Sequence, residues 1–115
     1  MKFVALIALV AALAVASVAS AATPTLVGTV GPGFTITLTK GGKKVSKLTA
    51  GTYVFQISDK SSIHNFHLTG HGGLNKKTSV GGTGSSTWKL TLKKGTYKFV
   101  CDPHASLMKG SFTVS

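Results

Sequence analysis

The chain has 115 residues and a formal net charge of +11, because it contains 13 basic residues and only two acidic ones. That length is enough for one small domain and no more. The two acids, Asp59 and Asp102, lie far apart in the sequence and no Ser–His–Asp arrangement is evident, which argues against an enzyme.

The N-terminus has the three parts of a secretory signal peptide. Met1-Lys2 is a basic start, residues 3–16 form an apolar run, and Ala19-Ser20-Ala21 is a small-residue cleavage site. We therefore expect residues 1–21 to be removed and residues 22–115 to form the exported domain, in the periplasm, the cell envelope or outside the cell. An uncleaved membrane anchor is the alternative, since the apolar run nearly reaches the ~20 residues that a span needs.

Charge and export together narrow the class of partner. The basic excess favours anionic partners. Every basic residue is a lysine, so the chain lacks the arginine fork that suits base edges and phosphates, and we expect no binding to nucleic acid. An acidic protein or an anionic envelope surface fits better, while a role in solubility alone is the plain alternative.

Alternation of apolar and polar residues, typical of half-buried β-strands, recurs along the exported part. Residues that alternate onto one face are Phe34, Ile36 and Leu38; Tyr53, Phe55 and Ile57; Trp88, Leu90 and Leu92; and Tyr97, Phe99 and Cys101. A turn at residues 41–42 precedes a predicted return strand over 43–48, residues 70–86 predict a loop with one short strand, and residues 110–115 predict a last strand. We expect an all-β Greek-key β-sandwich of about seven to eight strands.

One short loop holds the only cysteine of the chain, with His104 three positions after Cys101 and Met108 four positions after that histidine. A lone cysteine in an exported domain has no disulfide partner in its own chain. Thiolate, imidazole and thioether are soft or borderline ligands that together suit copper. Pro103 allows the sharp turn that would bring all three to one ion.

A fourth ligand is expected from elsewhere, and three histidines are available in the segment "SSIHNFHLTGHGG". His64 shares the predicted inward face with Phe66 and Leu68, whereas His67 falls on the opposite face and His71 lies in a loop. The pattern therefore favours His64. A second surface site built from His67 and His71 is a weaker hypothesis, because the two side chains need not converge.

The segments "SDKSSIHNFHL" and "GTYKFVCDPH…MKGSFTV" resemble the cupredoxins, the blue copper proteins related to plastocyanin, pseudoazurin and amicyanin. The resemblance runs from about Phe34 to Ser115. It implies one type 1 copper ion per chain, held by His64, Cys101, His104 and Met108, and an Asn65 side chain that joins the two ligand segments by hydrogen bonds. Three residues separate His104 from Met108, where plastocyanin-like members usually have four and amicyanin has two, so the subfamily and potential stay open.

The resulting hypothesis is an exported, monomeric electron carrier. Four protein ligands would leave no open position for a substrate, which favours electron transfer over catalysis. By resemblance, Pro103, Ala105 and Leu107 form an apolar rim around His104 where redox partners dock. Lysines are expected to steer an acidic redox protein toward that end of the molecule.

Two other classes of function stay open on the sequence alone. One is an envelope protein that binds or delivers copper without transferring electrons, and the other is a metal-free β-sandwich interaction module. Each site residue also has a structural interpretation: Cys101 as an inert buried thiol, Met108 as core packing and His64 as a core histidine. Zinc is an alternative metal for a Cys/His site.

Overall fold

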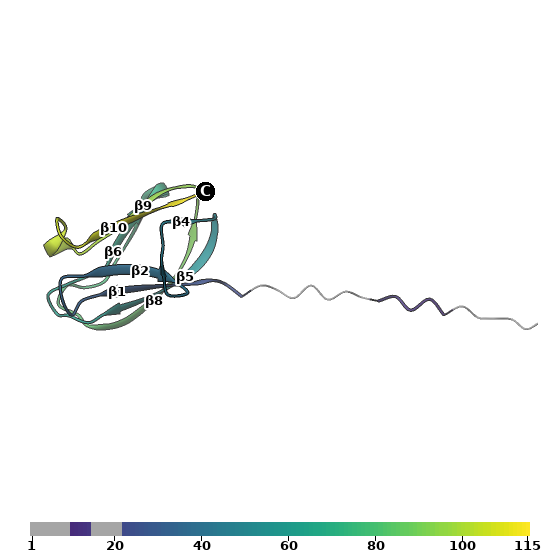
Figure 1. Ribbon diagram of the computed structural model, residues 1–115, viewed down its shortest axis with the longest axis horizontal. Helices are drawn as coiled ribbons and strands as arrows, with labels where there is room; N and C mark the ends of the chain where they lie inside the picture. Colours follow the sequence, from purple (N-terminus) through teal and green to yellow (C-terminus); the bar gives the residue numbers. More distant parts are fainter. Residues whose placement is uncertain (1–9, 15–21) are drawn as a thin grey trace, which may run out of the picture.

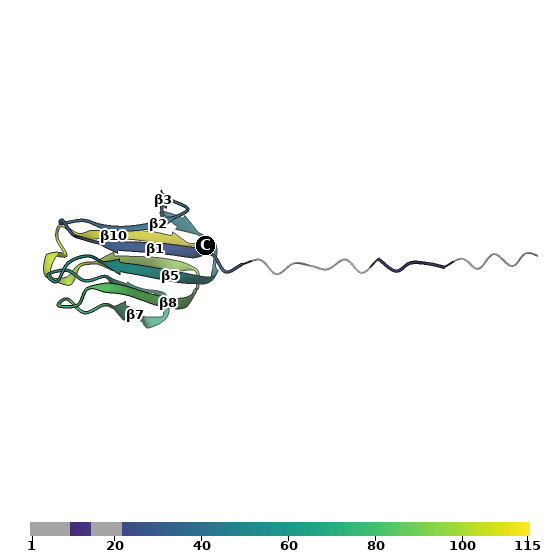
Figure 2. The same cartoon turned by 90° about the horizontal axis from the view of Figure 1, so that it is seen from below.

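A computed structural model describes residues 10–14 and 22–115, and residues 25–114 form two β-sheets packed face to face (Figures 1 and 2). Strands and two short 3₁₀ turns are the only regular elements in the described part of the chain, which confirms the all-β prediction. Most of the predicted signal peptide, residues 1–21, lies outside the described residues, so its cleavage stays a prediction. Within residues 10–14 and 22–115, no helix is long and apolar enough to cross a membrane.

Each sheet has five strands, and two of the ten are only two residues long. The first sheet has the order β3-β2-β1-β5-β8. Its strands are β1 (Thr25–Val30), β2 (Ile36–Lys40), β3 (Lys43–Lys44), β5 (Gly51–Asp59) and β8 (Gly84–Leu92). The second sheet has the order β4-β10-β9-β6-β7. Its strands are β4 (Lys47–Leu48), β6 (His67–Gly70), β7 (Leu74–Lys77), β9 (Gly95–Val100) and β10 (Lys109–Val114), with 3₁₀ turns η1 (His71–Gly73) and η2 (Asp102–His104).

The core lies between the two sheets and uses the faces that alternation predicted. In β5, Tyr53, Phe55 and Ile57 are all buried. Aromatic pairs strengthen the packing of the second sheet: Phe66, directly before β6, stacks on Phe99 of β9 with ring centroids 5.5 Å apart, and Tyr97 of β9 stacks on Phe112 of β10 at 5.2 Å. Burial of these rings supplies much of the apolar area that stabilises so small a domain.

The structure differs from the sequence-based expectation at the start of the domain. β1 was not among the predicted strands, yet it is central in the first sheet, where Leu26 and Val30 are buried. The predicted return strand over 43–48 is divided. Its first half, β3, pairs with β2, and its second half, β4, crosses to the other sheet and pairs with β10. The chain divides there because the buried Val45 side chain between the halves enters the core.

Two side chains also sit differently from the prediction. Phe34 was expected on the inward face of a strand, but β2 begins only at Ile36 and the Phe34 side chain is 53% exposed. His64 is buried as expected, but it lies in the loop that precedes β6 rather than within the strand. Both residues therefore belong to loops at one end of the sandwich.

Gly110 in β10 offers a test of how tightly this end is packed. A Cβ at Gly110 would overlap the ring of Phe99, which is itself held by its stack on Phe66. We expect Gly110→Ala to lower the free energy of unfolding by about 1–3 kcal/mol because the core must move to admit the methyl group.

The matched control is Gly81→Ala, since nothing lies within 4 Å of a Cβ built there. This variant should change stability by no more than about 0.5 kcal/mol. Urea denaturation of both variants checks the prediction, and equal stability of the two would contradict the packing described for Phe99.

Candidate metal centre

Three predicted ligands converge at one end of the sandwich, where the η2 loop lies opposite the end that carries the C-terminal residue (Figure 1). The Nδ1 atoms of His64 and His104 are 3.1 Å apart, and the Cys101 Sγ lies 3.6 Å from each. A triangle with these sides has a point about 2.0 Å from every corner. Bonds from imidazole nitrogen to a metal are about 2.0–2.1 Å long, so one ion fits between the three atoms.

Backbone hydrogen bonds of the β9–β10 connection position two of these ligands. The His104 N–H donates to the Cys101 carbonyl at 3.0 Å, which forms the η2 turn. The Met108 N–H donates to the His104 carbonyl at 2.8 Å, and the Cys101 N–H donates to the Met108 carbonyl at 3.0 Å. These three bonds close the loop, so Cys101 and Met108 are held side by side at the ends of their strands.

The third ligand, His64, depends on a close approach of two loops. Gly31 has a positive φ of 74°, and a Cβ there would lie 3.3 Å from Cδ2 of His64 and 3.0 Å from Cβ of Ser61. A residue with a side chain would be strained at this φ and would press on the imidazole. Gly31 therefore supports the His64 position, a role that the sequence analysis did not assign to it.

Burial distinguishes the two histidines. His64 and Cys101 are fully buried, whereas His104 is half-buried and reaches the surface. Nε2 of His64 has no hydrogen-bond partner among the described residues. Two lone-pair nitrogens 3.1 Å apart repel one another unless a proton or a metal cation lies between them. The donor set of two imidazoles and one thiolate fits one copper ion.

Met108, the predicted axial ligand, is buried at the end of the same loop, with 1% of its surface exposed. That position places it next to Cys101 in the backbone hydrogen-bond pattern. Its role as the axial ligand stays a prediction.

Asn65 connects the two ligand segments through its backbone and its side chain. Its N–H donates to Sγ of Cys101 at 3.5 Å. Its amide nitrogen donates to the Asp102 carboxylate at 2.7 Å, and its amide oxygen accepts the Asp102 N–H at 2.8 Å. Because Asp102 directly follows Cys101, these bonds hold the thiol segment against the His64 segment.

His67 extends this network outward. Its Nδ1 lies 2.8 Å from the Asp102 carboxylate and its Nε2 lies 2.6 Å from the amide oxygen of Asn75. Both ring nitrogens therefore have protein partners, and the only metal-type cluster in the described part of the chain is His64, Cys101 and His104. The hypothesis of a second site from His67 and His71 receives no support from this arrangement.

Phe34 is a site residue that sequence reasoning missed. Its ring centroid lies 5.2 Å from that of His64 and 5.0 Å from that of His104, with edge-to-face geometry in both contacts. The ring packs against both imidazoles from the solvent side. The glycine–proline stretch directly before it, residues 31–33, was the available signal that this segment is a loop.

The residues predicted for partner docking lie on the β9–β10 connection, residues 101–108, which is called the ligand loop from here on, and they are exposed. Pro103 and Ala105 are exposed, and Leu107 is 66% exposed. Two further large apolar side chains, Phe34 in the β1–β2 loop and Ile63 next to His64, are 53% and 52% exposed. The half-buried His104 therefore has exposed apolar side chains on the loops near it, among them Phe34 and Leu107.

A family model described as a cupredoxin-like domain matches residues 4–114, so the chain belongs to the cupredoxin-like family. This match begins within the predicted signal peptide. Cupredoxins are electron-transfer proteins rather than enzymes, so the family agrees with the expectation that this chain is not an enzyme.

Solved structures of rusticyanin share the fold. Reduced rusticyanin at 1.9 Å resolution aligns with a TM-score of 0.62 and 21% sequence identity, over 84% of this chain and 82% of that chain. Rusticyanin from Thiobacillus ferrooxidans at 1.27 Å gives a TM-score of 0.58 and 23% identity, over 84% and 79%. The copper protein rusticyanin at 2.1 Å gives 0.63 and 20%, over 84% and 80%. No curated protein sequence matches the chain.

The Asp102 network predicts a pH-dependent contribution to stability. Burial alone would raise the pKa of Asp102, but hydrogen bonds from His67 and Asn65 outweigh it and hold the pKa below its usual 3.8. A carboxylate with a depressed pKa stabilises the fold above its unfolded-state pKa, and the contribution is lost as the pH falls through the folded-state value.

Asp102→Asn in the copper-free protein should therefore be less stable than the wild type at pH 6, and the difference should shrink as the pH falls below about 4. Thermal denaturation at a series of pH values measures this difference. Two parallel curves, with a constant gap from pH 6 to the lowest pH measured, would show that the carboxylate is not held in its charged form by the network.

Proposed function

We propose that this chain is an exported type 1 blue copper protein that carries single electrons between redox partners through one copper ion. The observation that carries the proposal is the triangle of His64 Nδ1, His104 Nδ1 and Cys101 Sγ, in which His64 and Cys101 are fully buried. A trigonal set of two imidazoles and one thiolate with a weak axial thioether is the donor set of blue copper electron-transfer sites. When bound, copper would supply the change between Cu(II) and Cu(I).

The protein around the site favours electron transfer because hydrogen bonds between protein groups constrain the segments that carry the ligands. The loop hydrogen bonds of Cys101, His104 and Met108 and the Asn65 bonds to Asp102 constrain both ligand segments. Ligands held by such a supporting network move little when the charge of the ion changes. A fast electron carrier needs that property, whereas a copper-delivery site must open to release its metal.

The exposed edge of His104 is the proposed path for electrons. Phe34, Pro103 and Leu107 surround or neighbour it with exposed apolar surface. A small apolar contact area loses little solvation energy when a partner docks and leaves, which suits a transient electron-transfer complex. We propose an acidic redox protein as the partner, because the chain carries 13 basic residues and two acidic ones.

Export is part of the proposal and is supported by the sequence of the first 21 residues. The single cysteine is buried in the site, so the described part of the chain offers no thiol for a disulfide. We propose that the domain acts as a monomer in the periplasm or at the cell envelope.

The first experiment is the visible absorption spectrum after addition of one equivalent of Cu(II). The wild type should develop an intense band from thiolate-to-copper charge transfer that ascorbate bleaches. Cys101→Ala should lack the band, while His71→Ala, which removes a histidine outside the site, should keep it.

Two outcomes would contradict the proposal. A colourless product that binds zinc but not copper would indicate a structural metal site. A coloured product without a reversible one-electron wave in voltammetry would indicate copper storage or delivery. Either result would leave the cupredoxin-like fold in place without the proposed activity.

The axial role of Met108 can be tested separately. Met108→Leu keeps the buried volume, so the fold and the charge-transfer band should remain. Loss of a thioether donor destabilises Cu(II) more than Cu(I), so the reduction potential should rise. An unchanged potential, measured by voltammetry, would show that Met108 only packs in the core.

A further inference from the structure

Half of the lysines in the described part of the chain gather along one side of the sandwich rather than around the metal centre. They line three adjoining recesses: Lys40, Lys43, Lys44 and Lys47 in the first, Lys44 and Lys109 in the second, and Lys44, Lys98 and Lys109 in the third. Lys44 takes part in all three, so the recesses adjoin one another, and together they are called the lysine groove. The volumes of the three recesses are about 410, 270 and 410 Å³.

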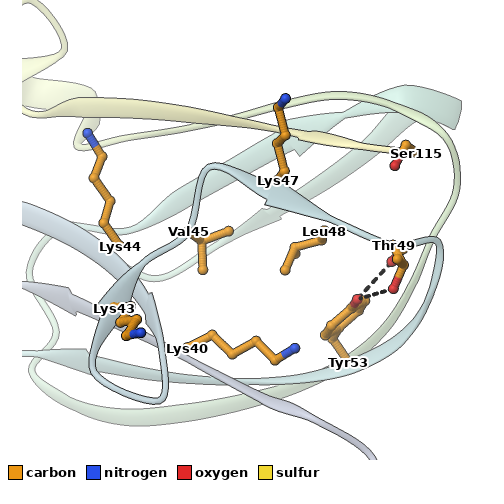
Figure 3. Close-up of a pocket in the computed structure, with 9 residues that line it drawn as sticks. All are labelled: Lys40, Lys43, Lys44, Val45, Lys47, Leu48, Thr49, Tyr53 and Ser115. Carbon is orange, nitrogen blue, oxygen red and sulfur yellow. Dashed lines mark hydrogen bonds between the residues drawn. The ribbon is translucent and has the colours of Figure 1, made fainter.

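The lysine groove runs the length of the sandwich. Its first recess includes Ser115, at the end far from the η2 loop (Figure 1). Figure 3 shows this recess, with Lys40 extended along one side toward Tyr53 and Lys47 on the other. Its other two recesses include Lys109, which directly follows Met108. One end of the lysine groove therefore lies beside the ligand loop.

The groove is open because the strands on either side of it are only partly covered. β3 pairs with β2 only at Thr39 and Lys40, and β4 pairs with β10 only at Thr113 and Val114. Residues 36–38 of β2 and residues 109–112 of β10 have no further strand beside them on this side. The second recess lies between these two uncovered edges.

No acidic side chain lines the lysine groove. Asp102 belongs to the network at the ligand loop and Asp59 is buried at the end of β5, so neither neutralises these lysines. Lysines on edge strands also prevent unwanted strand pairing, which is the plain structural explanation. That role needs only a few charges and no recess, whereas here six lysines contribute to the lining of three adjoining recesses.

We propose that the lysine groove binds an extended, carboxylate-rich segment of the partner protein and so sets the partner against the ligand loop. The charges are spread along the groove instead of converging on one point, so they match a row of anions better than a single phosphate or lipid headgroup. The aromatic side chains that line it, Tyr53 and Phe99, are buried, so it offers no platform for stacking nucleic-acid bases.

This proposal rests on the proposed function in one respect, namely that the partner is a redox protein. The binding itself does not require copper. It also revises the expected place of the lysines. The lysines attract the partner along the β2–β10 side of the molecule. The exposed apolar side chains near His104 lie at one end of that side.

The test uses a synthetic glutamate-rich peptide as the probe and isothermal titration calorimetry at low salt. Two triple variants remove the same charge: Lys43→Gln/Lys44→Gln/Lys47→Gln in the lysine groove, and Lys89→Gln/Lys93→Gln/Lys94→Gln elsewhere. The groove variant should bind about tenfold more weakly, and the control should change binding by less than about twofold.

Equal weakening in both variants, or no binding of the peptide to the wild type, would overturn the proposal. Tighter binding to phosphatidylglycerol vesicles or to a single-stranded oligonucleotide than to the peptide, lost in the groove variant, would overturn the choice of partner. The charge-transfer band of copper, recorded on the same samples, keeps the two hypotheses apart. A normal band without peptide binding rejects only the groove, and peptide binding without a band rejects only the copper function.

Discussion

The metal centre depends on the register of three adjacent strands at Val100. Val100 in β9 pairs with His67 of β6 on one side and with Lys109 of β10 on the other. Each ligand segment starts at the residue next to one of these three paired residues: Cys101 follows Val100, Met108 precedes Lys109, and the loop that holds His64 ends directly before His67. A slip of β9 by one residue against its neighbours would turn Cys101 away from the core and separate it from the histidines. The core packing that fixes the register is therefore also what assembles the site.

Beyond the ends of these strands, side-chain hydrogen bonds hold the loops together in place of strand pairing. Asn65 and Asp102 exchange two bonds across the gap between the β5–β6 loop and the β9–β10 loop. His67 binds the second oxygen of the same carboxylate from the strand surface. A buried site with three electron-pair donors is costly without a cation, because buried lone pairs need a partner. The network keeps the donors together, and the structure thereby favours a bound metal over a relaxed empty pocket.

The features that could be predicted from the sequence are those that leave a periodic pattern or a fixed residue spacing in it. Alternation identified the buried face of β5 and β9, and the Cys101–His104–Met108 spacing located the ligand loop. His64 was selected by alternation, although it lies in a loop whose position is set by Gly31. Phe34 and His67 were not assigned their contacts, because these arise where loops far apart in sequence meet, and no local pattern records such meetings. The division of residues 43–48 between sheets was missed for the same reason.

The distribution of charge separates attraction from electron transfer. One of the two acids is buried and the other is hydrogen-bonded to Asn65 and His67, so the field around the described domain is set by its lysines. The exposed apolar side chains near His104 carry no charge and give an approaching molecule little direction at long range. A partner oriented by the lysine groove would meet the ligand loop at Lys109, one residue from Met108. In this arrangement the charged side could change with the partner while the register at Val100, and with it the metal centre, stays unchanged.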